Sequence, residues 1–81
     1  METRVALLSI IVDNPESVEP LNELLHDYRL HIIGRMGLPY REKDMCIICV
    51  AMDAPQDIIS ALSGKIGRLE GVSAKTVYSK Q

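Results

Sequence analysis

The chain has 81 residues, of which 47% are hydrophobic and 25% are charged, and its formal net charge is −2. This length fits one domain, 1–81, and the high apolar fraction excludes a disordered chain. The three tyrosines are the only aromatic residues. Together with the acidic balance, this argues against direct nucleic-acid binding, which relies on stacking aromatic side chains and basic surfaces.

The sequence predicts no membrane partner. Its longest apolar runs, 5–12 and 45–52, are eight residues each, whereas a membrane-spanning helix needs about 20. The first residues lack the basic start and the small-residue cleavage site of a signal peptide. We therefore expect a cytoplasmic protein in which Cys46 and Cys49 are reduced.

The first half of the chain has the pattern of a strand followed by a helix. Residues 5–12 form a short run rich in β-branched side chains, and an Asp-Asn-Pro turn signal follows, which favours a buried strand. Asn14 is a suitable N-cap and Pro15 a suitable first helical residue, and apolar residues recur at helical spacing to about residue 29. Pro20 either kinks this helix or marks its true first turn.

The second half has the pattern of two strands, a helix and a last strand, with the strands at 31–38, 45–52 and 72–78. Two glycines in the first of these strands indicate a bulge or a close backbone approach. The polar stretch 39–44 suits a hairpin connection. Asp53-Ala54-Pro55 repeats the cap-then-proline pattern, which predicts a helix that runs to about Leu69, with Gly71 as its C-terminal stop.

The order strand, helix, strand, strand, helix, strand is that of the ferredoxin-like split βαβ arrangement. We therefore predict an α+β fold, βαββαβ, in which a four-stranded antiparallel sheet carries two helices on one face. The other face of such a sheet is open. Because side chains alternate between the faces of a strand, a solvated open face should show a polar residue at every second position.

The strands predicted at 5–12 and 45–52 do not show this alternation, since both runs are apolar on both faces and Ser9 is the only polar residue in the first. Leaving about six to eight such side chains in water would forfeit roughly 10 kcal/mol. That is comparable to the stability of a whole domain, about 5–15 kcal/mol. We predict that the open face packs on another copy of the chain, in a homodimer or a tetramer.

Cysteine and histidine spacings argue against a metal or redox site. Cys46 and Cys49 match the C-x-x-C pattern of such sites. On a strand, however, their odd spacing directs the thiols to opposite faces, about 10 Å apart along the chain, which is too far for a disulfide. His26 and His31 are suitable metal ligands, but their spacing fits no single helical face. We interpret the cysteines as core or interface residues and the histidines as solvated or hydrogen-bonded.

Two glycine motifs and the carboxylates have simple interpretations. Gly64-Lys65 lacks the earlier glycine and the following Ser or Thr of a phosphate loop. Gly64 and Gly67 match the GxxG of KH-type RNA binders, but they lie in an apolar helical period, where we interpret them as allowing close packing of the helix. No Ser/His/Asp arrangement is evident, and the aspartates at 13, 44, 53 and 57 fall at predicted turns or caps. The sequence therefore predicts no catalytic site.

Four segments carry a resemblance to a known family: NELLH at 22–26, HIIGRMGLPYR at 31–41, ALSGKIG at 61–67 and GVSAKT at 71–76. They resemble a small family of iron-only hydrogenase system regulators over nearly the whole chain. That family is similar in fold to ACT domains and to the regulatory domain of the nickel-responsive repressor, which oligomerise through their sheets and bind effectors at subunit interfaces. The resemblance implies a non-enzymatic sensing or regulatory module connected with hydrogenase maturation or expression.

The chain departs from both of these related patterns. In ACT domains the first strand–helix loop carries an Asp-x-Pro-Gly-like element that cradles an amino acid. Asp13-Asn14-Pro15 matches this element, but Glu16 replaces the glycine, which removes the close backbone approach and adds a negative charge. The His-x-His and Cys ligands of the nickel repressor are absent, since His31 is followed by two isoleucines. Its ribbon-helix-helix DNA-binding segment is also missing, so we expect this chain to act with a partner.

Two hypotheses follow for the function. The first is a homo-oligomeric ACT-like regulatory domain with a small-molecule or metal effector at the interface; its candidate ligand-binding residues are Asp13, Asn14, His31, Arg35, Met36 and Gly37. Arg35 lies between two glycines and either binds a carboxylate or phosphate or serves as an edge-strand charge that discourages aggregation. The second is a ligand-free scaffold or adaptor that presents the hairpin 40–43 to a partner protein. A metal-handling protein and an RNA binder rank below these two, and the sequence leaves the identity of any effector or cofactor open.

Overall fold

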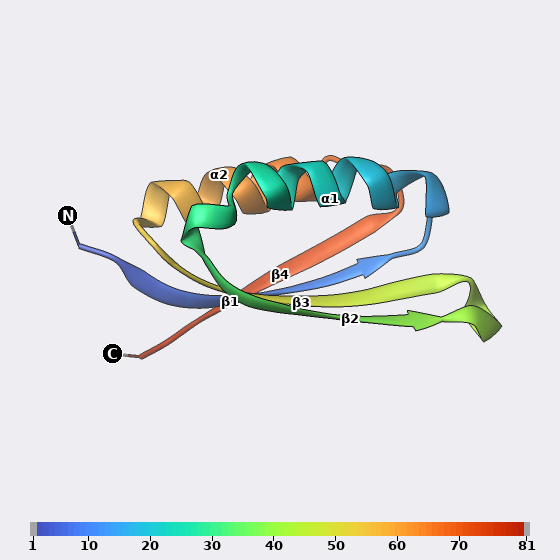
Figure 1. Ribbon diagram of the computed structural model, residues 1–81, viewed down its shortest axis with the longest axis horizontal. Helices are drawn as coiled ribbons and strands as arrows, with labels where there is room; N and C mark the ends of the chain where they lie inside the picture. The colour runs from blue at the N-terminus through green and yellow to red at the C-terminus, as the bar shows by residue number, and fades with distance from the viewer. Residues whose placement is uncertain (1, 81) are drawn as a thin grey trace.

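The computed structural model describes residues 2–80, which form two layers, a sheet and a pair of helices (Figure 1). The α-helices are α1 (Val18–Asp27) and α2 (Gln56–Gly67). Three short 3₁₀ helices lie in the connections, at Pro15–Ser17, Arg29–His31 and Arg41–Lys43. The strands are β1 (Arg4–Val12), β2 (Ile32–Tyr40), β3 (Met45–Ala54) and β4 (Val72–Tyr78).

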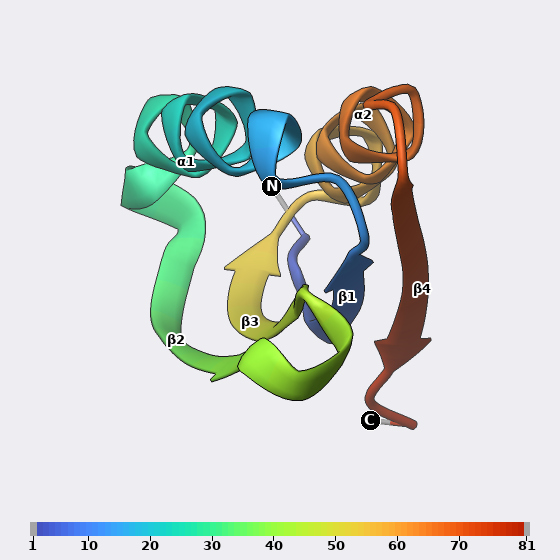
Figure 2. The ribbon, with the colours of Figure 1, turned by 90° about the vertical axis from the view of Figure 1, so that its right-hand side faces the viewer.

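The four strands form one antiparallel sheet in the order β2-β3-β1-β4. Both α-helices lie over the same face, α1 towards the β2 side and α2 towards the β4 side (Figure 2). This is the ferredoxin-like βαββαβ arrangement that the element order predicted. Its consequence for the site is that nothing among residues 2–80 covers the other face of the sheet.

The core lies between the sheet and the helices. Thirteen apolar residues are buried there: Ala6, Leu8, Ile10, Val12, Leu21, Leu25, Ile48, Val50, Met52, Ala54, Ile59, Leu62 and Ile66. The strand residues in this set are the even-numbered positions of β1 and β3, because alternate side chains point to the same face. The helical residues recur at three- and four-residue spacing, which puts them on the side of each helix that packs on the sheet.

The start of the first helical segment is as predicted. The side chain of Asn14 accepts a hydrogen bond of 3.1 Å from the backbone N–H of Glu16, and Pro15 begins the 3₁₀ turn. Pro20 is the third residue of α1 and therefore lies in its first turn. Because the first turn of a helix has no preceding carbonyl partners, the missing N–H of Pro20 costs little there and no kink results.

The predicted start of α2 is wrong. Asp53 and Ala54 belong to β3, where they pair with Val5 and Arg4, and Pro55 is the N-cap. The same Asp-x-Pro pattern here marks the end of a strand, because β1 extends far enough for Arg4 to pair with Ala54, the last residue of β3. β2 also extends beyond its predicted end, through Pro39 and Tyr40.

Glycine positions also differ from the predictions. α2 ends at Gly67, and Gly71 lies later, in the turn before β4, with φ +70°. A Cβ added at Gly71 would lie 2.7 Å from the Cβ of Asn14, so the first loop and this turn need a glycine at their contact. A Cβ added at Gly64 or Gly67 would meet nothing within 4 Å, so the predicted close packing of the helix does not occur within the chain.

Candidate functional site

The open face of the sheet is the most distinctive surface of the molecule. It carries the odd-numbered residues of β1, β3 and β4, whose even-numbered neighbours face the helices. The large exposed side chains that β1, β3 and β4 place on this face are 41–58% exposed, and they are Val5, Leu7, Ile11, Ile47 and Val77. We call these five residues the open-face cluster. The cluster agrees with the prediction that β1 and β3 are apolar on both faces.

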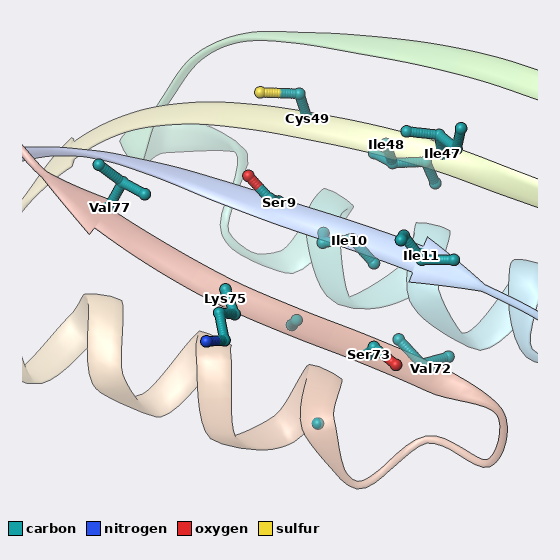
Figure 3. Close-up of a pocket in the computed structure, with 12 residues that line it drawn as sticks. Ser9, Ile10, Ile11, Ile47, Ile48, Cys49, Val72, Ser73, Lys75 and Val77 are labelled. Carbon is teal, nitrogen blue, oxygen red and sulfur yellow. The ribbon is translucent and has the colours of Figure 1, made fainter.

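A shallow hollow crosses this face between β3, β1 and β4. Figure 3 shows Ile47 and Ile11 on neighbouring strands, with Cys49 and Ser9 beside them. Ile11 pairs with Ile47, and Ser9 pairs with Cys49. Lys75 of β4 pairs with Ser9 and is the charged residue that lines the hollow. The lining is therefore mostly apolar and has one basic group at its side.

The residues predicted to bind a ligand lie in separate places in one chain. Asp13 follows β1, where Val12 pairs with Cys46, and Asn14 caps the next turn. His31 precedes β2, whose first residue pairs with Met52 at the other end of β3. Six residues of extended chain separate the two ends of β3, which places Asp13 and His31 about 20 Å apart along the strand direction.

Arg35, Met36 and Gly37 are consecutive in β2 and therefore alternate between the faces of the sheet. Met36 pairs with Cys49 on the open face, whereas Arg35 pairs with Val50 and Gly37 with Ile48, whose side chains are buried beneath the helices. Nη2 of Arg35 donates a hydrogen bond of 3.0 Å to Oδ1 of Asn22 in α1. The guanidinium is thus exposed at the edge of the sheet, on the helix side.

The two cysteines lie on opposite faces of β3, as their spacing predicted. Cys46 packs against the core, and Cys49 lines the hollow of the open face. Both are free thiols. Among residues 2–80, no group of three or more His, Cys, Asp or Glu side chains is placed to hold a metal ion.

The sequence reasoning missed the exposure of β2. All residues of β2 after its first are exposed, including Met36 and Leu38 on the open face. It also missed that β4 contributes Val77 to the open face. The alternation of half-buried and exposed residues along β4 starts at Val72, and the regular V-S-A-K-T-V-Y pattern carries that signal in the sequence.

No helix in the described part of the chain is both long and apolar enough to span a membrane. The βαββαβ order and the sheet order β2-β3-β1-β4 define a ferredoxin-like α+β domain. Residues 4–76 match the TM1266-like family, whose description is "Iron-only hydrogenase system regulator, putative". The chain belongs to this family, and the family is described as a regulator and not as an enzyme, in agreement with the non-enzymatic module that the resemblance implied.

Solved structures confirm the fold. The uncharacterized protein TM1266 from Thermotoga maritima is 42% identical and superposes with a TM-score of 0.94, covering 98% of this chain and 100% of that chain. A formyltetrahydrofolate deformylase from Pseudomonas putida KT2440 has a TM-score of 0.68 at 12% identity, covering 95% of this chain and 29% of that one. This second likeness concerns the fold alone.

Curated relatives are similar over part of their length. Proteins named "Putative nickel-responsive regulator" from Saccharolobus islandicus, strains L.S.2.15 and M.16.4 among them, are 26% identical over 66 residues. The match covers 82% of this chain and 49% of the relatives. The chain thus spans about half the length of the curated relatives it matches.

Proposed function

We propose that this chain is a regulatory module of the iron-only hydrogenase system that works as a homo-oligomer assembled through the open face of its sheet. The observation that carries the proposal is the open-face cluster, in which five large apolar side chains on three adjacent strands are 41–58% exposed. Scattered apolar residues on a surface are ordinary, but a continuous patch of this kind marks an interaction site.

The free energy gained by covering the open face is comparable to the cost of association. Complete burial of one large apolar side chain contributes about 1.5–3 kcal/mol, so covering the exposed half of each member of the cluster returns about 1 kcal/mol. Five members in each of two copies give about 10 kcal/mol, which is within the range of about 4–15 kcal/mol that association costs in lost freedom. Met36 and Leu38 lie on the same face and are more exposed still, so they add to this sum.

A small effector or a metal held between copies is the second part of the proposal. Asp13, Asn14, His31, Arg35, Met36 and Gly37 remain its candidate ligands, and their separation within one chain means that a shared site would draw on two copies. Arg35 supports this assignment, because its exposed guanidinium is bound to a neutral amide and retains donors for a carboxylate or phosphate. The name of the Saccharolobus relatives supports nickel as one candidate.

Calorimetric titration of the assembled protein tests this part. The titrants are Ni²⁺, Zn²⁺ and Fe²⁺, a set of amino acids, and nucleotides. For an anionic effector, Arg35→Ala should abolish the binding heat, whereas Arg68→Ala, which removes an exposed arginine beyond the end of α2, should preserve it. Silence of the wild-type protein across all three classes contradicts an effector role.

A ligand-free adaptor is the second candidate function, favoured by the turn between β2 and β3. Tyr40 is partly exposed there, and its hydroxyl donates a hydrogen bond of 3.3 Å to Oε2 of Glu42. Arg41 and Lys43 follow in the same 3₁₀ turn, so the tip presents an aromatic ring and both signs of charge. A stoichiometric protein partner that is retained by the wild type and lost with Tyr40→Ala, together with silent calorimetry, would favour this function.

A further inference from the structure

A row of three polar side chains crosses the hollow of the open face. Lys75 of β4 pairs with Ser9 of β1, and Ser9 pairs with Cys49 of β3, so the three residues lie side by side on one face of the sheet. Neighbouring strands are about 4.8 Å apart, so the row is about 10 Å long. All three residues line the hollow, and Figure 3 shows them on neighbouring strands, with Lys75 at the β4 side.

The residues that flank Ser9 on the same face of β1 are apolar, and so are partners of theirs. Leu7 pairs with Val77 on one side of the polar row. Ile11 pairs with Ile47 on the other side. The hollow has a volume of about 780 Å³, within the range of about 300–1,000 Å³ that is usual for small-molecule sites. A mostly apolar depression with a few polar groups is also the usual composition of such a site.

The ammonium group in this row has no partner. No side-chain hydrogen bond or ion pair among residues 2–80 involves Lys75, Ser9 or Cys49. Asp53 is the acidic residue on the same face, but it pairs with Val5, four residues along β1 from the partner of Lys75. The two charged side chains are therefore about 13 Å apart along the strand direction. The ammonium of Lys75 and the hydroxyl of Ser9 are thus adjacent donors that are available to an anion.

We propose that the hollow binds a free organic anion with an unbranched apolar body, a carboxylate of about eight carbons. The carboxylate accepts hydrogen bonds from Nζ of Lys75 and Oγ of Ser9, and the chain lies over Ile11 and Ile47. An extended chain of this length spans about 10 Å, which matches the distance from β4 to β3. The site goes beyond the proposed function, because it is complete within one chain and includes none of the six candidate ligands named there.

Calorimetric titration with sodium octanoate tests the site. The titration uses the wild type and Val5→Glu, because Val5 belongs to the open-face cluster but does not line the hollow, so this substitution disfavours stacking and keeps the site. We expect Val5→Glu to bind octanoate at least as tightly as the wild type does. Octylammonium has the same chain and the opposite charge, and it should bind about 10-fold more weakly than octanoate. The net charge of the chain is −2, so general attraction would favour the cation instead.

Reversal of the charge at Lys75 tests the role of the ammonium. Lys75→Glu should reverse the preference, so that octylammonium binds more tightly than octanoate. Arg68→Glu is the matched control, because it makes the same change of charge at an exposed residue between the helices, away from the hollow. We expect the control to keep the preference of the wild type for octanoate.

Protection of Cys49 from alkylation places the ligand. In Val5→Glu, saturating octanoate should slow the alkylation of Cys49 at least about 3-fold and leave Cys46, which packs against the core, unchanged. The proposal is overturned if neither protein binds octanoate, if both octyl probes bind equally, or if Cys49 is not protected. Binding to vesicles of phosphatidylcholine and phosphatidylserine without binding of octanoate would assign the surface to a membrane and also overturns it. All of these results are independent of the stacking of open faces, which Ile47→Glu tests separately.

Discussion

Substitution of Ile47 by glutamate is the sharpest perturbation of the open face. Ile47 is 41% exposed and pairs with Ile11, and both residues line the hollow. A face-to-face assembly buries this position, whereas an isolated chain leaves it half in water. The variant therefore separates the stability of the fold from the stability of the assembly.

The magnitude follows from the exposed fraction. Burial of a whole isoleucine side chain contributes about 1.5–3 kcal/mol, so burial of the exposed two fifths of Ile47 contributes about 0.6–1.2 kcal/mol in each copy. A dimer contains two copies of Ile47, so the substitution removes this contribution twice. Burying a carboxylate without a partner costs several kcal/mol more per ion. The substitution should weaken association by at least about 5 kcal/mol, which raises the dissociation constant more than about 1,000-fold.

The assay is sedimentation velocity at matched concentrations of the wild type, Ile47→Glu and a control. Ala61→Glu is the control, because it adds the same charge to an exposed position of α2 in the helix layer. We expect a lower mass for Ile47→Glu by a factor of two or more, an unchanged mass for Ala61→Glu, and folded circular dichroism spectra for both. An unchanged mass for Ile47→Glu at tens of micromolar refutes the stacking of open faces.

Three further predictions concern the fold and the cysteines. Gly71→Ala should lower the free energy of unfolding by about 2–4 kcal/mol, because Gly71 has a positive φ and lies in contact with Asn14. Gly64→Ala should instead raise the free energy of unfolding by up to about 1 kcal/mol, because Gly64 lies in a helix and has open space around it. Urea denaturation of both variants tests the contrast. Ser17→Ala should cost about 1 kcal/mol in thermal unfolding, since the buried hydroxyl donates a hydrogen bond of 2.6 Å to the carbonyl of Glu70; no loss of stability would contradict that role. Alkylation of Cys49, which lines the open face, should become faster on dilution and in Ile47→Glu, because both changes separate the stacked faces. Cys46 packs against the core and should react slowly under all of these conditions. Mass spectrometry of the labelled peptides distinguishes the two cysteines.

The sequence predicts the fold well where local patterns and tertiary contacts agree. The β-branched run at 5–12, the Asn14 cap and the apolar period of α2 each indicate the element that forms. The open face was predictable for a related reason, because alternation along β1 and β3 leaves apolar residues on both sides. Fold and assembly surface thus derive from the same period-two pattern.

Features fixed by distant partners were not predictable from local patterns. Asp53 has the same Asp-x-Pro context as the first loop, yet it pairs with Val5 in the sheet, because ladder hydrogen bonds from β1 are available to it. Gly71 is required by Asn14, which is far away in the sequence. The candidate ligands Asp13 and His31 lie at opposite ends of the sheet because the antiparallel topology puts them there. Asp13 and His31 would contribute to one site only if Asp13 of one copy lay close to His31 of a second copy.

Sedimentation equilibrium of the full chain tests the central claim most directly. The chain has a mass of 9.0 kDa. Stacking of open faces predicts a mass at least twice that value at micromolar concentration. A mass of one chain across the micromolar range would contradict the assembly, and with it the proposal that an effector is held between copies.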